Sequence, residues 1–350
     1  MRSDSRSQLN VLSNDPITLS PRVRCAWPGR LLPAVALALL LANGFPGRAA
    51  EPRDTVWHVH QDDQKGVLEV FRGDQKLLVY AFATNQFKPY VKELYTLKGG
   101  NVLRDAPPDH LHHHGLMFAI RVNGINFWEE RTDPGHQVEV KGKVRVPDAL
   151  PGPATISLSR LIHWVAHKDS ARARSARAAL LVERRTIAVS VKEAQQEVAL
   201  HWRSDFTVGR AAPKVTLSGA NYHGLGLRLP AEFDHVVKHQ NSANLPYSAE
   251  QKGDVTPANW SAVSHTLNGH DTMVVLFSHP HNPGEAKFFT MLDAFAYLSA
   301  TQDWEKKPQQ YATGQKFRLD YLLTLYSPPP SPEFLKQRYE RWVQGVDAQK

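Results

Sequence analysis

The sequence predicts an all-β protein of antiparallel strands that ends in a single helix. Beyond the first fifty residues, strand-like segments recur at short intervals, with almost no helical periodicity between them. Several of these segments alternate apolar and polar residues, which is the period of a strand with one buried face. Only the last twenty residues carry an amphipathic helical pattern. We therefore predict one large domain, an antiparallel sandwich or a larger stacked-sheet fold.

The clearest strands show either a turn between them or strict alternation. Segments 67–72 and 76–81 flank Gly73-Asp74, which predicts a hairpin. Apolar residues alternate with polar ones over 138–146 and again over 317–325. Further strands are predicted at 157–165, 179–191, 198–208 and 273–277. The basic run Arg172, Arg174 and Arg177 falls between two of them and is expected at a solvated hairpin tip.

The predicted helix occupies residues 331–350. Ser331 suits the N-cap and Pro332 the first helical position. Five apolar residues then fall on one side of the helix, which predicts that it packs against a sheet; they are Phe334, Leu335, Tyr339, Trp342 and Val346. Residues 328–330 are prolines and form a stiff link to it.

The N-terminal segment reads as a signal peptide over residues 1–49. A basic, polar stretch precedes a short apolar run at 31–45, and small residues follow at Gly47 and Ala49, which predicts cleavage after Ala49. The remaining chain then divides into a single β domain, 50–330, and the helix. No later segment is apolar enough to span a bilayer, so we expect a periplasmic or secreted protein.

Removal of residues 1–49 changes the charge and the available chemistry. The segment holds six basic and two acidic residues, so the net charge falls from +8 to +4. It also holds Cys25, the chain's only cysteine, which leaves no disulfide, no thiolate nucleophile and no cysteine metal ligand. We find no nucleic-acid motif.

The most informative stretch is residues 109–130, where four histidines precede an Asn123-Gly124 hairpin turn. The histidines are His110, His112, His113 and His114. A two-residue turn pairs Val122 with Ile125, and an unbroken strand would place Phe118 opposite Glu129.

Three interpretations of these histidines remain open. A metal site would take at most two ligands from this segment, because His110 and His114 would lie about 13 Å apart on a strand. Acid–base chemistry would suit imidazoles oriented by a nearby acid, which could be Asp109, Glu129, Glu130 or Asp133. A hydrogen-bonded, partly exposed cluster is the structural alternative. Four adjacent imidazoles serve packing poorly, so the cluster as a whole favours a functional site.

A second informative stretch is residues 222–230. Alternation places Tyr222, Gly224, Gly226 and Arg228 on one face of the predicted strand. The glycines would leave that face open, and Arg228 would then offer its guanidinium to a carboxylate or to a pair of sugar hydroxyls. The alternative is a bulge at the glycines, with Arg228 paired to an internal acid.

The loop at residues 278–283 holds His279 and His281 between prolines. These two side chains could add a ligand or a proton carrier to the first cluster, or could simply face water. Trp260, Asp303 and Trp304 are weaker candidates for lining a sugar site.

These motifs together resemble the PmoA-like family of secreted bacterial proteins of unknown function. The resemblance is carried by 88–90, by 104–113 with Gly115-Leu116, by Asn123-Gly124 followed by Phe127-Trp128, and by 222–228 and 277–283. It implies a galactose mutarotase-like supersandwich with a sugar-directed site on a concave sheet face. By position, Asp109, His110, His112, His113 and Arg228 match the family pattern, whereas His114 and His223 replace other residues. The membrane helices of a methane oxygenase subunit are not expected from this sequence.

The leading hypothesis is an enzyme that acts on a saccharide by proton transfer, as an epimerase, lyase or hydrolase. His110, His112 and His113 with Asp109 and Glu130 form the predicted catalytic set. The predicted substrate-binding set is Arg228, Tyr222, His279, His281 and Trp128. The alternatives are a non-catalytic carbohydrate-binding protein and a metal-dependent oxidase. The sequence assigns no metal ligands, cofactor or oligomeric state, and the expected partner is a small molecule or an oligosaccharide.

Overall fold

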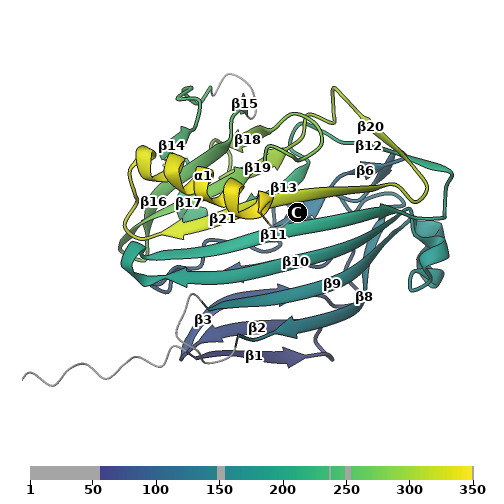
Figure 1. Ribbon diagram of the computed structural model, residues 1–350, viewed down its shortest axis with the longest axis horizontal. Coiled ribbons are helices and arrows are strands. Elements are labelled where there is room, and N and C mark those ends of the chain that lie inside the picture. The colour runs from purple at the N-terminus through teal and green to yellow at the C-terminus, as the bar shows by residue number, and fades with distance from the viewer. Residues whose placement is uncertain (1–55, 148–153, 236–237, 249–253, 349–350) are drawn as a thin grey trace, which may run out of the picture. The chain divides into compact units, whose positions relative to one another are not determined.

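The computed structural model describes residues 56–147, 154–235, 238–248 and 254–348. All of them belong to the compact unit Pro52–Lys350. The predicted signal peptide, its cleavage site and Cys25 lie outside the described residues. Within these residues the strands form three sheets, and every strand pairing is antiparallel (Figure 1).

The first sheet has nine described strands. In spatial order they are β1 (Trp57–Asp62), β2 (Val67–Arg72), β3 (Gln75–Ala81), β4 (Tyr90–Leu94), β5 (Leu116–Ala119), β13 (Gly224–Arg228), β19 (Tyr297–Thr301), β18 (Lys287–Met291) and β15 (Asp254–Pro257).

The second sheet has eight described strands. In spatial order they are β14 (Lys238–Asn241), β16 (Trp260–Leu267), β17 (His270–Ser278), β21 (Lys316–Tyr326), β11 (Glu197–Val208), β10 (Leu181–Lys192), β9 (Thr155–Val165) and β8 (His136–Arg145).

A third, small sheet contains four short strands, and four 3-10 turns join larger elements. The strands are β20 (Gln309–Ala312), β12 (Lys214–Ser218), β6 (Arg121–Val122) and β7 (Ile125–Asn126). The turns are η1 (His167–Arg172), η2 (Ala176–Ala178), η3 (Glu193–Gln195) and η4 (Ala231–Phe233).

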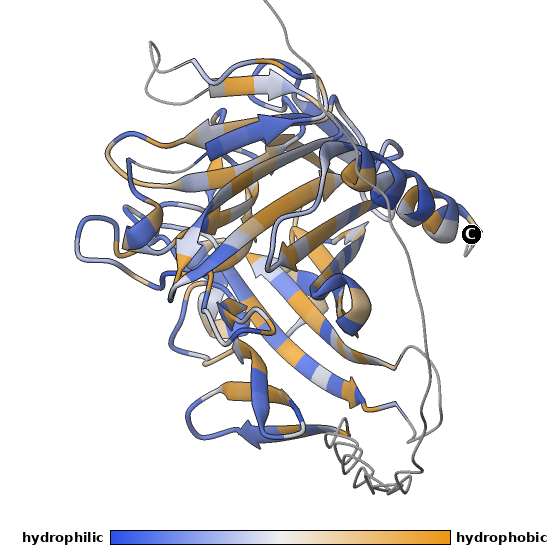
Figure 2. Cartoon of the chain, turned by 90° about the vertical axis from the view of Figure 1, so that its left-hand side faces the viewer, coloured by the Kyte–Doolittle hydropathy of each residue, from blue (hydrophilic) through white to orange (hydrophobic). Residues whose placement is uncertain are grey.

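The hydrophobic core lies between the two large sheets. Phe118 of β5 contacts Trp164 of β9 and Tyr321 of β21, with ring centroids 5.9 and 6.4 Å apart. Residues from both sheets join one buried cluster, and strands alternate hydrophobic and hydrophilic positions where one face is exposed (Figure 2). This arrangement confirms the predicted all-β antiparallel sandwich with one C-terminal helix.

The predicted strands 67–72, 76–81, 157–165, 198–208, 273–277 and 317–325 all fall in observed strands, and the predicted strand 179–191 begins two residues before β10 does. The early hairpin is shorter than predicted. Val122 pairs with Ile125 as expected, but Phe118 pairs with Leu225 of β13 and not with Glu129. The reason is local: the Asn126 side-chain oxygen accepts the backbone N–H groups of Trp128 and Glu129, at 2.8 and 3.3 Å, and turns the chain out of the ladder.

The C-terminal helix is α1 (Pro332–Asp347), and it covers part of the second sheet (Figure 1). The Ser331 side chain accepts the Phe334 N–H at 3.3 Å, as the capping prediction requires. Leu335, Trp342 and Val346 pack against residues of β11, β16, β17 and β21. No helix in the described ranges is long and apolar enough to cross a membrane.

The helix also buries one charge that its apolar pattern does not reveal. Arg338 is 8% exposed and makes three hydrogen bonds of 3.0–3.1 Å to the carboxylate of Glu197, at the start of β11. The Tyr326 hydroxyl donates to the same carboxylate at 2.7 Å. This ion pair fixes the helix on the sheet.

Candidate functional site

A pocket of about 350 Å³ lies where the early histidine segment meets the strands β18 and β19. It combines imidazoles, aromatic rings, one acid and one exposed cation. The lining residues are His110, His112, His113, Glu129, Arg131, Tyr222, Phe289, Met291, Phe295 and Tyr297.

The histidines reach this pocket on a compact loop, not on the continuous strand considered above. The Ala106 N–H donates to the His113 carbonyl, and the His113 N–H donates to the His110 carbonyl, both at 2.9 Å. Gly115 then returns the chain to β5 with φ +31°, in a position where a Cβ would overlap the Val91 carbonyl oxygen of β4. The loop therefore holds three nearby imidazoles together instead of alternating them on two faces.

The imidazoles pack against each other and against the aromatic wall. His113 stacks on His110 with centroids 4.5 Å apart and meets His112 edge to face at 4.7 Å. Phe295 lies 4.8 Å from the His110 ring, and Tyr297 lies 5.6 Å from the His113 ring. These ring contacts hold the imidazoles in place, and they leave at least one nitrogen atom, His113 Nδ1, without a hydrogen bond.

His112 and His113 are neutral at pH 7. Burial, reinforced by the positive charge of Lys88, lowers the pKa of His112 to about 4. Burial, together with the neighbouring His112 and His110, lowers the pKa of His113 to about 2. His113 is 7% exposed, and its buried Nδ1 has no hydrogen-bond partner among the described residues. A neutral imidazole with a free nitrogen can accept a proton or a hydrogen bond from a ligand.

Two carboxylates near the imidazoles are ionised. Burial opposes ionisation of Glu129, but the nearby His223 ring, with Nε2 3.7 Å away, and hydrogen bonds from Tyr222 and Asn126 hold the pKa of its carboxyl well below the usual range. The Tyr222 hydroxyl donates to Glu129 at 2.6 Å. Burial likewise opposes ionisation of Asp109, while the contacts with His110 and Arg228 lower its pKa to about 2.

Arg228 adjoins the histidine loop, but it does not stand on an open strip as expected. Its Nη2 donates to Asp109 at 3.1 Å, and its guanidinium lies 3.7 Å from the centre of the Phe295 ring. The glycine face is filled by aromatic rings: a Cβ on Gly226 would overlap the Tyr297 hydroxyl and come within 3.0 Å of Trp128. Arg228 is only 2% exposed, so its guanidinium contacts Asp109 and Phe295 and not solvent.

Glu130 lies behind the pocket and not among its lining residues. Its carboxylate pairs with Lys88 and lies 3.3 Å from His114 Nε2. His114 Nδ1 lies 3.1 Å from Asp105, and these contacts raise the pKa of His114 despite its burial. The expected bond from Glu130 to His112 or His113 is not formed, and Glu130 acts on His112 as a nearby negative charge that opposes the effect of Lys88 on its pKa.

Trp128 also lies behind the lining residues. It is fully buried and stacks on His223 at 5.1 Å, while its edge faces His113 at 6.4 Å. Tyr222, by contrast, is one of the residues that line the pocket. Trp128 therefore supports the wall that Tyr222 and His113 form.

The loop with His279 and His281 lies on the second sheet, and the structure does not bring it to the histidine pocket. His281 Nε2 lies 3.0 Å from Asp320 of β21, and the His279 ring packs on Trp342 of α1 at 5.3 Å. Together with Asp347, these two histidines place three possible metal-ligand atoms within 4.8 Å of one another. His279 Nδ1, however, accepts the His281 N–H at 3.2 Å, so its neutral form carries the proton at Nε2, the nitrogen that faces Asp347.

Several lining residues escaped the sequence analysis. Phe295 and Tyr297 lie far along the chain from the histidines and come together with them only in the sheet. Lys88 has a fully buried side chain and was noted only within a family motif. Glu129 was predicted only as one of four acids that could orient an imidazole, and the only signal for Arg131 was its position next to Glu130.

The fold and site together define an all-β sandwich protein with a histidine-lined, aromatic pocket. Residues 67–340 match the model of DUF6807, a family of unknown function, and the chain belongs to this family. No curated protein sequence matches the chain.

Solved structures give similarities at low identity. The chain is similar to the galactosidase domain of the α-galactosidase–sucrose kinase AgaSK, with 8% identity, 77% of this chain and 41% of that chain covered, and a TM-score of 0.38. It is also similar to the GH36 α-galactosidase AgaB of Geobacillus stearothermophilus, with 11% identity, 77% of this chain and 41% of that chain covered, and a TM-score of 0.40. A third similar structure is a putative aldose 1-epimerase of Klebsiella pneumoniae, with 10% identity, 82% of this chain and 85% of that chain covered, and a TM-score of 0.39. The chain spans only about two fifths of the length of AgaSK and of AgaB.

Proposed function

We propose that the histidine pocket binds a saccharide unit and removes a proton from it, with His113 or His112 as the general base. The observation that carries this proposal is the buried, unpartnered Nδ1 of a neutral His113 in a pocket walled by aromatic rings. A base must be unprotonated at the working pH, and the lowered pKa values keep both imidazoles in that form; the same lowering weakens them as bases, so His112, with a pKa of about 4, is the stronger base of the two.

The lining suits a sugar ring. Tyr222, Phe295 and Tyr297 offer apolar ring surface, while Glu129, Arg131 and the imidazoles offer hydrogen-bonding groups. A volume of about 350 Å³ is near the lower end of ligand pockets, which span roughly 300–1,000 Å³. The pocket therefore fits one monosaccharide unit, either free or at the end of a chain.

The carboxylates favour proton abstraction over glycoside hydrolysis. A glycosidase pairs an ionised carboxylate with a carboxylic acid whose pKa is raised, so that it can protonate the leaving group. Here the pKa values of Glu129 and Asp109 are both lowered. Both groups are thus suited to accept hydrogen bonds from sugar hydroxyls, and an epimerase or lyase reaction fits the site better than hydrolysis.

The test is solvent hydrogen exchange. The protein is incubated in D₂O with a panel of aldoses, ketoses and uronic acids, and loss of the carbon-bound ¹H signal is followed by NMR. We expect exchange with at least one sugar class, and a loss of about 10²-fold or more in H113Q or H112Q. The control H270Q changes an exposed histidine at the start of β17, outside the pocket, and should retain the rate. Full exchange in the H112Q/H113Q double variant would overturn the proposal.

A non-catalytic sugar-binding role is the second candidate, because the aromatic wall alone can carry affinity. In that case the same sugars would bind without exchange, and F295A would weaken binding more than H113Q does.

The export of the chain and its PmoA-like resemblance remain predictions. Residues 1–49 carry the export prediction, and N-terminal sequencing of protein recovered from a periplasmic fraction would test it: a mature terminus at Ala50 is expected.

A further inference from the structure

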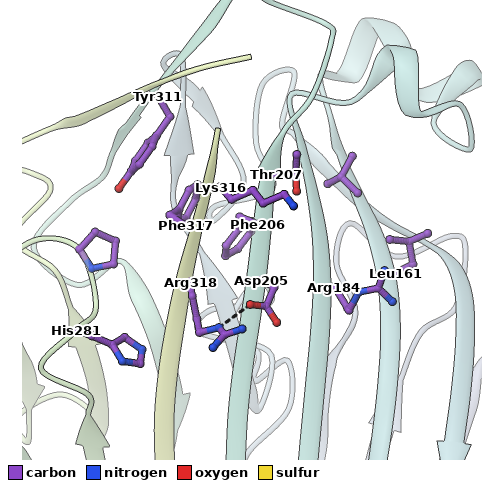
Figure 3. Close-up of a pocket in the computed structure, with 12 residues that line it drawn as sticks. Leu161, Arg184, Asp205, Phe206, Thr207, His281, Tyr311, Lys316, Phe317 and Arg318 are labelled. Carbon is purple, nitrogen blue, oxygen red and sulfur yellow. Dashed lines mark hydrogen bonds and ion pairs between the residues drawn. The ribbon is translucent and has the colours of Figure 1, made fainter. Parts of the chain in front are cut away.

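A second cavity, of about 740 Å³, lies on the face of the eight-stranded sheet that points away from the core (Figure 3). It shares no lining residue with the histidine pocket. Its lining is Leu161, Val182, Arg184, Asp205, Phe206, Thr207, His281, Pro283, Tyr311, Lys316, Phe317 and Arg318.

Strand register places the charges of this cavity in a row. Arg184 of β10 pairs with Asp205 of β11, which in turn pairs with Arg318 of β21. Paired residues in adjacent strands point to the same face of a sheet. Lys316 lies two residues from Arg318 on β21, so its side chain emerges on that face as well.

Two of the three cations lack a protein partner. Arg318 Nε donates to Asp205 at 2.6 Å, and this pair is drawn in Figure 3. Arg184 and Lys316 are exposed and make no side-chain hydrogen bond or ion pair within the part of the chain that the structure describes. They lie two strands and two residues apart, about 12 Å between their Cα atoms at standard sheet spacings. The cavity thus offers two separated positive charges.

An aromatic stack reaches the cavity at the end of the sheet, and two of its rings, Phe206 and Phe317, point to the core face because they alternate with the charged residues along their strands. The Tyr311 ring lies 4.6 Å from Phe317, which lies 4.7 Å from Phe206. Phe206 is 1% exposed and Tyr311 is partly exposed, so the stack runs from the core to the cavity wall. A partly exposed tyrosine supported from below is a rigid platform for the apolar face of a sugar.

The cavity continues along the sheet. Asp205 also lines a second hollow of about 430 Å³, which extends to His201, Arg203 and Arg338. Arg203 and Arg338 are neutralised there by Asp320 and Glu197. The unpaired charge is therefore at the first cavity, while the joined hollows have room for a chain of several units. We call the two together the outer groove.

We propose that the outer groove binds an acidic oligosaccharide that carries at least two carboxylates, which pair with Arg184 and Lys316. Asp205 lies between the two cations and accepts sugar hydroxyls, and Tyr311 meets a ring face. A polynucleotide fits less well, because its evenly spaced phosphates would face the Asp205 carboxylate.

The experiment measures binding by calorimetry at low and moderate salt. The probes are hexamers of galacturonate and of mannuronate, a neutral glucose hexamer, and an oligothymidylate of matched charge. We expect saturable, salt-sensitive binding of a uronate hexamer and at least about tenfold weaker binding of the neutral hexamer and of the oligothymidylate. R184E/K316E should weaken uronate binding by about tenfold or more. R184Q/K316Q removes the two charges without reversing them and should also weaken uronate binding, so it replaces R184E/K316E if charge reversal impairs folding.

Two controls separate the outer groove from other sites. K98E/K168E makes the same charge change at exposed lysines outside both cavities and should retain binding. H112Q/H113Q should also bind normally, so a failure of the histidine-pocket proposal leaves this one standing. Failure of every uronate hexamer to bind, equal binding of the oligothymidylate, or unchanged binding in R184E/K316E would each overturn the proposal.

Discussion

Gly226→Ala tests the packing beneath the histidine pocket. Gly226 is on β13, in the middle of the nine-stranded sheet, where a Cβ would overlap the Tyr297 hydroxyl and approach Trp128 to 3.0 Å. Both rings are buried, so neither moves without disturbing its neighbours. Overpacking of this kind costs about 1–3 kcal/mol, partly offset by the smaller entropy that alanine gives to the unfolded chain.

The same contact predicts a specific coupling. Tyr297→Phe removes the hydroxyl, which donates to the Tyr222 carbonyl at 3.3 Å, and should cost about 0.5–1.5 kcal/mol by itself. In the double variant the added methyl group no longer meets the oxygen, and its nearest neighbour is the ring carbon Cζ at 2.7 Å, so the overlap is reduced but not removed. The combined loss should then be smaller than the sum of the single losses by about 1 kcal/mol or more.

Urea unfolding followed by circular dichroism measures all four states of this cycle. A shift in the midpoint at constant m reports stability alone. Gly345→Ala is the matched control, because a Cβ at this helical position meets nothing within 4 Å and should raise stability by up to about 1 kcal/mol. Additive losses in the G226A/Y297F cycle, or a G226A protein as stable as the parent, would refute the account of how the glycine face is filled.

Two further predictions concern buried charge. Glu197→Gln should destabilise the protein by about 3–5 kcal/mol in urea unfolding, since it leaves the buried Arg338 without its counter-charge; a loss under about 1 kcal/mol would show that the pair does not fix the helix. His113 has a folded-state pKa far below its unfolded value, so its contribution to stability is complete above about pH 6.5 and falls as the pH drops below it. At pH 5 the loss from this residue is at most about 2 kcal/mol, and H113Q should flatten the pH dependence of the urea midpoint between pH 7 and 5; an unchanged slope would place His113 in a wetter environment.

The candidate site shows where prediction from sequence reaches its limit. The histidine segment could be singled out because four imidazoles within five residues are a poor choice for packing, and three of them do line one pocket. Their arrangement could not be derived, since the strand assumed for them is a compact loop. Arg228 does pair with an acid, as in the alternative considered for it, but that acid is the exposed Asp109 and not an internal one.

The loop at residues 278–283 illustrates the opposite failure. Its histidines resembled those of the first cluster in type, and nothing in the sequence showed that β17 belongs to the other sheet. Residue type alone placed them in the site. The sheet order instead assigns them to Asp320 and to the C-terminal helix.

The sequence by itself determined the local structure of this protein: the alternating strands, the Asn123-Gly124 turn and the capped helix depend on side chains close together in the chain. Only the tertiary structure decided which strands became neighbours, and with them the aromatic wall of the histidine pocket and the row of charges in the outer groove. The physical reason is that sheet pairing joins residues a hundred or more positions apart, such as Arg318 and Asp205 or Leu225 and Phe118. Hydrophobic periodicity fixes which face of a strand is buried, but it does not specify the strand's partner.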